Sequence, residues 1–197
     1  MPKQLLITYF IVYLVVAFFW RSFLVWRRTG INPYALGKGD NAHDFIGKRF
    51  RLLVITVAVV VFLDVVSPNT YQYLMPVVWL QHPFWVGIGW VLLLVSLIWI
   101  AAAQAQMGSS WRIGIDTQNQ TKLVQTGLFR LSRNPIFLGM RLNLLGLFLV
   151  LPNAVTLVIL LLGDALIQIQ VRLEETHLSE AHGEGYQAYC QQVRRWL

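Results

Sequence analysis

Long apolar runs with few charges constrain the fold of this chain more than any other feature of its sequence. The first run follows Met1-Pro2-Lys3 and continues for 22 residues, and four more precede the C-terminus. A helix needs about 20 apolar residues to cross the hydrocarbon core of a bilayer. With 56% hydrophobic residues and eight tryptophans in 197 residues, the chain is too apolar for an ordinary soluble domain. These runs predict an all-α membrane protein.

Five transmembrane helices are predicted within a single membrane domain, residues 1–197. Three belong to the N-terminal part, residues 1–103, and two form a helical hairpin, residues 135–171, within the C-terminal part, residues 104–197. The residues LPNA between the last two runs allow only a tight turn, so these two helices should be antiparallel neighbours. The five runs are Leu5–Trp26, Leu52–Val66, Phe84–Ala103, Pro135–Leu151 and Ala154–Val171.

The segments between the runs carry weaker signals. The first loop, RRTGINPYALGKGDNAHDFIGKRF, is rich in Gly, Asn and Asp and is expected to be irregular, with a lid or substrate-contacting role left open. The alternation at Ser110–Ile115 predicts a short hairpin or loop on the membrane surface. Gly87 and Gly89 belong to no complete nucleotide-binding motif, so close helix packing accounts for them better.

Basic residues gather on one side of the predicted spans. They lie in the loops after the first and third runs and in the C-terminal tail, whereas the opposite side holds only Lys3. The positive-inside rule then predicts an outside N-terminus and a cytoplasmic C-terminal helix in an inner or cell membrane. The net charge of +7 does not reside on a soluble domain, so we expect no nucleic-acid partner. A lone Cys190 excludes an intramolecular disulfide.

Two polar islands follow apolar runs in the C-terminal half. The first, Gly127–Gly139, reads GLFRLSRNPIFLG, and the second is Arg172–Tyr189. The second island contains a Glu-Glu pair followed by the spacing G-x-x-Y-x-x-Y. Each motif alone is weak, but their joint occurrence at this spacing is specific. The residues that carry the two motifs are Gly127, Phe129, Arg133, Asn134, Pro135, Phe137, Gly139, Glu174, Glu175, Gly183, Tyr186 and Tyr189.

These islands resemble the isoprenylcysteine carboxyl methyltransferase and phospholipid methyltransferase family of integral membrane enzymes, over roughly residues 104–197. The resemblance implies S-adenosylmethionine as cofactor and a lipophilic or prenylated acceptor that enters from the bilayer lipids. Apart from Gly183, the motif residues above become candidate cofactor-binding residues. Eukaryotic-type members have His and Tyr at the positions of Asn134 and Phe137, and Asn134 cannot act as a titrating base.

A polar stripe runs along the last predicted span. Asp164, Gln168, Arg172 and Glu175 fall at i, i+4, i+8 and i+11, which places them on one face of a helix. Lipid would not tolerate such a face, so it should meet protein or an aqueous pocket. Gln168 is therefore a further candidate for cofactor binding, and Glu175 is also a candidate catalytic residue.

The hairpin geometry also predicts an ion pair. Residues at equal distance from the Pro152–Asn153 turn lie at one depth, which pairs Arg141 with Asp164 and places Arg133 level with Arg172. Charges inside a membrane segment usually pair or line a cavity. The pair either holds the hairpin together or directs Arg141 toward an acidic substrate group, which makes Arg141 a second candidate catalytic residue. At the start of this hairpin, Arg133 and the free N–H groups after Pro135 offer a site for a carboxylate.

Three functions remain open from the sequence. The leading hypothesis is a methyltransferase that acts on a lipophilic acceptor, such as a prenylcysteine-like carboxylate. An amine acceptor must lose a proton, and no base is evident, so phospholipid N-methylation comes second. A non-catalytic scaffold or transporter is the third, although no internal repeat supports a transporter. His177 and His182 lack metal-site spacing, so no metal is expected. The oligomeric state is not indicated.

Overall fold

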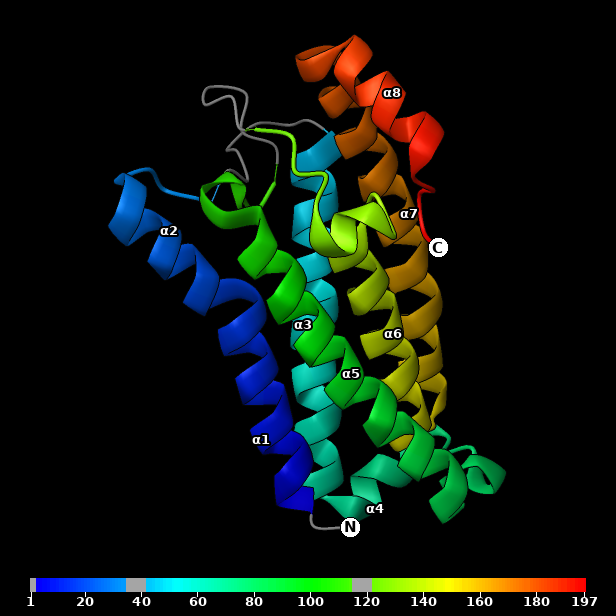
Figure 1. The fold of residues 1–197 in the computed structure, drawn as a ribbon. Helices are drawn as coiled ribbons and strands as arrows, with labels where there is room; N and C mark the ends of the chain where they lie inside the picture. Colours follow the sequence, from blue (N-terminus) through cyan, green and yellow to red (C-terminus); the bar gives the residue numbers. More distant parts are fainter. Residues whose placement is uncertain (1–2, 35–41, 115–121) are drawn as a thin grey trace.

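The computed structural model describes residues 3–34, 42–114 and 122–197, which form a bundle of long helices (Figure 1). Its first helix is α1 (Lys3–Leu14), which continues through the π-helical segment η1 (Val15–Trp20) into α2 (Arg21–Thr29). Gly30 ends this helix because its φ of 70° is left-handed, and its N–H donates to the Trp26 carbonyl. The described residues form helices and no β-strand, as the apolar runs predict.

The second long helix, α3 (Ala42–Val66), starts earlier than the sequence indicated. The apolar run begins at Leu52, but charged and apolar residues before it are already helical, so this part of the first loop is not irregular. Asp44 lies in the first turn, where a carboxylate favours a helix start, and Ile46 is buried. Residues 35–41 of the predicted loop lie outside the described residues, and the lid role therefore stays a prediction.

A short segment joins α3 to α5 (Pro83–Met107) at the N-terminal end of the bundle. It consists of α4 (Pro68–Tyr71) and the 3₁₀ turns η2 (Gln72–Leu74) and η3 (Val78–Gln81). The Val77 N–H donates to the Pro152 carbonyl at 2.8 Å, which holds this segment against the turn of the C-terminal hairpin.

Helices α5 and α6 (Pro135–Val150) cross at a pair of glycines. A Cβ on Gly89 would lie 2.9 Å from the Gly146 carbonyl oxygen, and a Cβ on Gly146 would lie 2.9 Å from the Gly89 carbonyl oxygen. The two backbones can approach this closely only because neither residue has a side chain. The packing role predicted for Gly89 is therefore confirmed, whereas a Cβ on Gly87 would have no neighbour within 4 Å among the described residues.

The C-terminal hairpin consists of α6 and α7 (Ala154–His182), joined by the predicted tight turn. Asn153 is completely buried and caps α7, since its side chain accepts from the Thr156 N–H and the Thr156 hydroxyl accepts from the Asn153 N–H. This reciprocal cap fixes the direction in which the chain leaves the turn. It thereby sets the two helices side by side.

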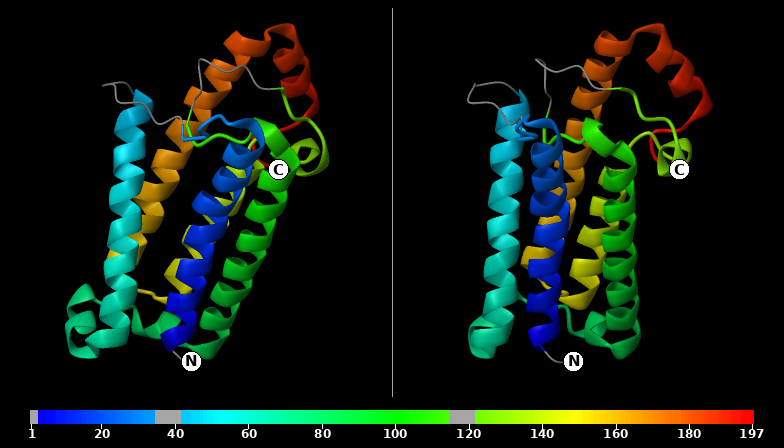
Figure 2. Two further views of the ribbon diagram at one scale, coloured as in Figure 1. Left: turned by 90° about the vertical axis from the view of Figure 1, so that its left-hand side faces the viewer. Right: turned by 60° about the vertical axis from the view of Figure 1, so that its left-hand side comes forward.

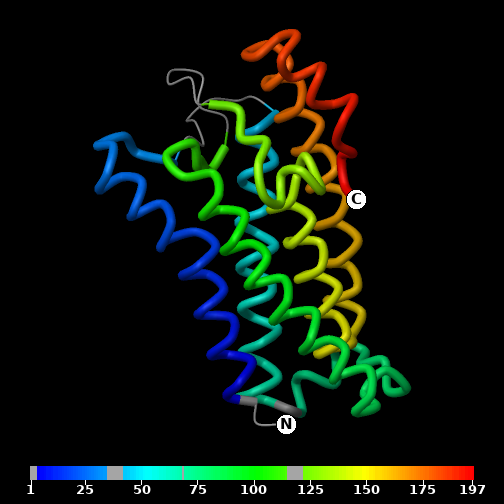
Figure 3. Tube along the Cα trace, in the orientation of Figure 1, coloured from blue at the N-terminus to red at the C-terminus, as the bar shows by residue number. Residues whose placement is uncertain are grey.

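The polar islands meet at the opposite end of the bundle, which we call the α8 end (Figure 2). Here α8 (Glu184–Gln192) folds back from α7 at Gly183, and the residues after it run beside η5 (Gly127–Arg130) (Figure 3). Nearby, η4 (Gly108–Ser110) follows α5, and Ile113 forms a single bridge with Tyr34. The described part of Ser110–Ile115 thus pairs with a distant segment and does not fold into a hairpin of its own.

Within the described residues, three helices are long and apolar enough to cross a membrane, namely Gln4–Thr29, Pro83–Ser110 and Ala154–His182. Helix α6 is apolar but has only 16 residues, and α3 carries charges in its first half. The five spans and their orientation therefore stay predictions.

Candidate functional site

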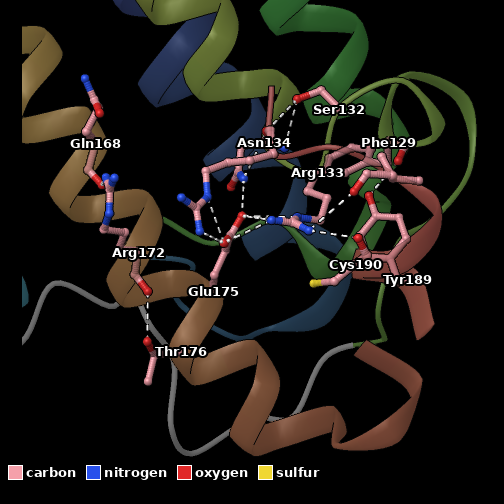
Figure 4. A network of polar contacts seen from close by, with 12 residues as sticks. Phe129, Ser132, Arg133, Asn134, Gln168, Arg172, Glu175, Thr176, Tyr189 and Cys190 are labelled. Atoms are coloured by element: carbon pink, nitrogen blue, oxygen red, sulfur yellow. Dashed lines mark hydrogen bonds and ion pairs between the residues drawn. The ribbon is translucent and has the colours of Figure 1, made fainter. Parts of the chain in front are cut away.

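Glu175 lies at the centre of a polar network at the α8 end (Figure 4). Its Oε1 accepts from Arg133 Nε at 3.2 Å and from Asn134 Nδ2 at 2.8 Å. Its Oε2 accepts from Arg133 Nη2 at 3.3 Å and from both Arg195 Nε and Nη2, at 3.0 and 2.8 Å. The carboxylate is only 10% exposed, so two arginines and an amide take up its hydrogen-bonding capacity. The Glu175 carboxylate in turn raises the pKa of Arg195.

Backbone contacts fasten the C-terminal tail onto the first polar island. The Arg133 N–H donates to the Arg194 carbonyl at 2.9 Å, and the Ser132 hydroxyl donates to the Arg195 carbonyl at 3.1 Å. Arg133 Nη1 also donates to the carbonyls of Cys190 and Val193. Because Arg133 bridges the tail and Glu175, the network joins three parts of the chain that are distant in sequence.

Tyr186 and Tyr189 lie beside this network with their rings tilted by 60° and the ring centroids 6.1 Å apart. The Tyr189 hydroxyl donates to the Phe129 carbonyl at 2.5 Å, and burial raises the pKa of Tyr189 to about 12. Burial also raises the pKa of Tyr186, whose hydroxyl has no hydrogen-bond partner among the described residues. Both phenols are therefore protonated at neutral pH. They cover the network on the side of α8.

The glycines of the first island have packing roles. A Cβ on Gly139 would lie 2.5 Å from the Ile100 side chain, so this glycine lets α6 pack against α5. Gly127 has a φ of +62°, and the side chain of Gln106 fills the space beside it and accepts from the Leu128 N–H at 2.7 Å. Pro135 starts α6, and its carbonyl accepts from Trp99 Nε1.

The predicted pair of Arg141 and Asp164 is present. Arg141 Nε donates to Asp164 Oδ1 at 2.5 Å, Gln168 Nε2 donates to Asp164 Oδ2, and the Arg141 guanidinium lies 4.6 Å from the Trp196 ring centroid. Arg172 is exposed and donates to the Gln168 carbonyl, so the predicted stripe does not continue as one network to Glu175. Arg133 reaches Glu175 and does not face Arg172.

A cavity of about 530 Å³ lies inside the bundle, between α1, α3, α5, α6 and α7. Its volume falls within the range of about 300–1,000 Å³ that is usual for small-molecule sites. Most of its wall is apolar, from Leu6 and Val61 at the N-terminal end to Phe137 near the α8 end. Polar side chains interrupt the apolar wall within the bundle, among them Tyr9, Tyr13, Gln104 and Asn143.

Glu174 faces this cavity, unlike its neighbour Glu175. Gln170 Nε2 donates to Glu174 Oε1 at 2.8 Å, and Gln170 also lines the cavity. Within the described part of the chain, Glu174 Oε2 makes no hydrogen bond, so one carboxylate oxygen is left for a ligand. Successive residues of a helix point about 100° apart, which separates the two carboxylates.

The structure thus divides the predicted site residues among distinct places. Phe137 and Glu174 line the cavity. The polar network around Glu175, which we call the tail network, contains Arg133 and Asn134, and the two tyrosines lie beside it. Arg141 and Gln168 form a third cluster on the hairpin. Sequence patterns do not single out four further polar residues, which are Ser132, Arg195, Gln170 and Arg51. The sequence marks Arg195 only as a topology signal, and nothing in it shows that the tail folds back.

Comparison with known proteins agrees with the position of both islands. A family model described as phospholipid methyltransferase matches residues 84–185, from the start of α5 into α8. No curated protein and no solved structure was found to match the chain. The matched range includes most of both polar islands and more than half of the sequence. The chain therefore belongs to the phospholipid methyltransferase family of integral membrane methyltransferases.

Proposed function

We propose that this protein is an S-adenosylmethionine-dependent methyltransferase that acts at the cytoplasmic face of the membrane on a lipophilic acceptor. The observation that carries the proposal is a mostly apolar cavity, inside a bundle with the family's motifs, that presents the Glu174 carboxylate at the α8 end. A membrane-embedded cavity suits an acceptor with a long apolar chain. The carboxylate beside it suits a small cationic cofactor.

The residues at the α8 end of the cavity fit the proposed cofactor. When bound, S-adenosylmethionine supplies an electrophilic methyl group on a sulfonium. Glu174 Oε2 can accept from its ammonium or a ribose hydroxyl, and Gln170 holds the other carboxylate oxygen in place. The Phe137 and Trp111 side chains line the same cavity and offer aromatic surface to adenine.

We propose a carboxylate, as in a prenylcysteine, as the preferred nucleophile. An ionised carboxylate needs no base, so the protein has only to position it in line with the methyl group and to exclude water. The apolar wall of the cavity provides that exclusion. Phospholipid N-methylation is the second candidate, favoured by the description of the matching family and by Glu174, which can accept a proton from an amine.

Binding of S-adenosylhomocysteine to the purified protein tests the proposal. Calorimetry in detergent should show saturable binding to the wild type and a roughly 10- to 100-fold loss in Glu174→Gln, since a hydrogen bond to a charged group contributes about 1.5–3 kcal/mol. Glu180→Gln is the matched control, because Glu180 is exposed on the same helix. Absence of binding by folded wild-type protein would overturn the methyltransferase proposal and leave a membrane scaffold as the better account.

A further inference from the structure

One wall of the cavity comes from outside the part of the chain that matches the family. Helices α1 and α3 precede residue 84, and they are two of the five helices that enclose the cavity. The matched part, α5 to α7, supplies Phe137 and Glu174 on the other side. The family motifs lie in the matched part, so the first wall is a separate surface that can contact the acceptor.

That first wall is mostly apolar along α1 and α3, but it ends in a cation. Arg51 lines the cavity near the α8 end, and its Nη2 donates to the Tyr34 hydroxyl at 3.1 Å. Tyr34 lines the cavity as well. The neighbouring basic residues of α3 do not share this position, because Arg49 lies over the Phe45 ring at 4.6 Å and Lys48 does not line the cavity.

The hydrogen-bonding pattern of this pair suits an anion. A guanidinium has five donors in a planar fork that matches a carboxylate or a phosphate, and only one of the Arg51 donors is used by a described residue. The Tyr34 oxygen accepts from Arg51, so the O–H of Tyr34 is left to donate to a ligand. Two side chains thus present donors at the end of the cavity where Glu174 presents an acceptor.

We infer that Arg51 and Tyr34 form the headgroup subsite of the acceptor and bind an oxyanion of it, a carboxylate or a phosphate. The apolar chain of the acceptor then lies along α1 and α3. The inference rests on the proposed function, since it names the acceptor class for the same cavity. It makes Arg51 a residue that determines acceptor specificity, while Glu174 serves the cofactor.

Binding of acceptor probes to the full-length protein in detergent, without cofactor, tests this subsite. The carboxylate probe is N-acetyl-S-farnesylcysteine, with its uncharged carboxamide as reference. The phosphate probe is a short-chain phosphatidylethanolamine, with the diacylglycerol of the same chains as reference. The wild type should bind at least one oxyanion probe about tenfold more tightly than its reference. A preference for the carboxylate probe over its carboxamide indicates a carboxyl acceptor. A preference for the phosphate probe over its diacylglycerol indicates a phospholipid.

Arg51→Gln should abolish this preference without weakening binding of the uncharged references. Arg51→Lys should keep part of it, because a point charge remains but the fork is lost. Tyr34→Phe should reduce it, and Arg49→Gln, which removes the same charge from the same helix, should leave it intact. Equal binding of charged and uncharged probes by the wild type, or a preference that survives Arg51→Gln, would overturn the subsite.

Titration with S-adenosylhomocysteine separates this inference from the proposed function. Arg51→Gln should bind it as tightly as the wild type does, since Arg51 is assigned to the acceptor. A wild type that fails to bind the cofactor product but shows Arg51-dependent oxyanion binding would refute the methyltransferase and keep the subsite. A wild type that binds the cofactor product but shows no preference for oxyanion probes would refute the subsite and keep the methyltransferase.

Discussion

At the scale of single residues, Glu174 and Glu175 are adjacent in sequence but have different surroundings. Glu174 lines the cavity and keeps one oxygen available, whereas Glu175 is enclosed by Arg133, Asn134 and Arg195. A carboxylate with every lone pair engaged by its own protein cannot bind a ligand without losing one of those partners. The geometry therefore favours a cofactor role for Glu174 and an anchoring role for Glu175.

Replacing the anchor should destabilise the protein. Glu175→Gln keeps the shape of the side chain but leaves Arg133, only 12% exposed, without a counter-charge. Breaking a buried ion pair in this way costs about 3–5 kcal/mol. The apparent Tm in detergent should fall well below that of Glu180→Gln, whose exposed side chain serves as the control. Equal Tm values for the two variants would show that the network does not anchor the tail.

At the scale of helices, the crossing of α5 and α6 places the first polar island. Gly89 and Gly146 bring the two backbones together, and Gly139 continues the contact toward Ile100 and Trp99 at the α8 end. The position of Asn134 and Pro135 at the start of α6 therefore depends on glycines farther along the helix. The same crossing forms one wall of the cavity.

A methyl group at this crossing should destabilise the bundle. In Gly146→Ala the new Cβ would lie 2.9 Å from the Gly89 carbonyl and 3.0 Å from the Leu93 nitrogen, both backbone atoms that cannot rotate away. Overpacking of this kind costs about 1–3 kcal/mol and outweighs the gain in helix propensity. Gly87→Ala is the control, since nothing lies within 4 Å of its Cβ position. Thermal unfolding in detergent would refute the close crossing if both variants matched the wild type.

At the scale of the whole molecule, polar and apolar regions are separated along the bundle. The tail network, the Glu174 end of the cavity and Arg51 all lie at the α8 end, whereas the segment α4 to η3 closes the other end. The N-terminus and α8 lie at opposite ends of the bundle (Figure 1). An odd number of membrane crossings places the two ends of a chain on opposite sides, so the predicted five crossings agree with this arrangement.

Cysteine labelling in intact cells can decide the orientation. Because Cys190 is the only cysteine, Cys190→Ser provides a background without thiols. In that background, a membrane-impermeant maleimide should label Gln72→Cys directly and Glu180→Cys only after the cells are permeabilised, since both positions are exposed. The reverse pattern would mean that the α8 end faces outward, away from cytoplasmic S-adenosylmethionine.

Local sequence patterns predict the long apolar helices of this fold. Apolar runs indicate helices because every backbone N–H and C=O must be satisfied within lipid. The short turn at Pro152 fixes an antiparallel hairpin, and equal depth in that hairpin pairs Arg141 with Asp164, as the structure confirms. The joint spacing of the two polar islands likewise predicts the family, and the family match confirms it.

Which polar groups meet depends on how the helices pack, and local patterns do not show it. The direction in which each glutamate points depends on the rotation of α7 against its neighbours. One partner of Glu175, Arg195, comes from a tail that folds back at Gly183. The cavity depends on five helices at once, including α3, which begins at Ala42 although its apolar run begins only at Leu52. Long-range packing leaves no periodic pattern in the sequence. The sequence therefore determines the apolar helices, and the packing of the bundle determines the site.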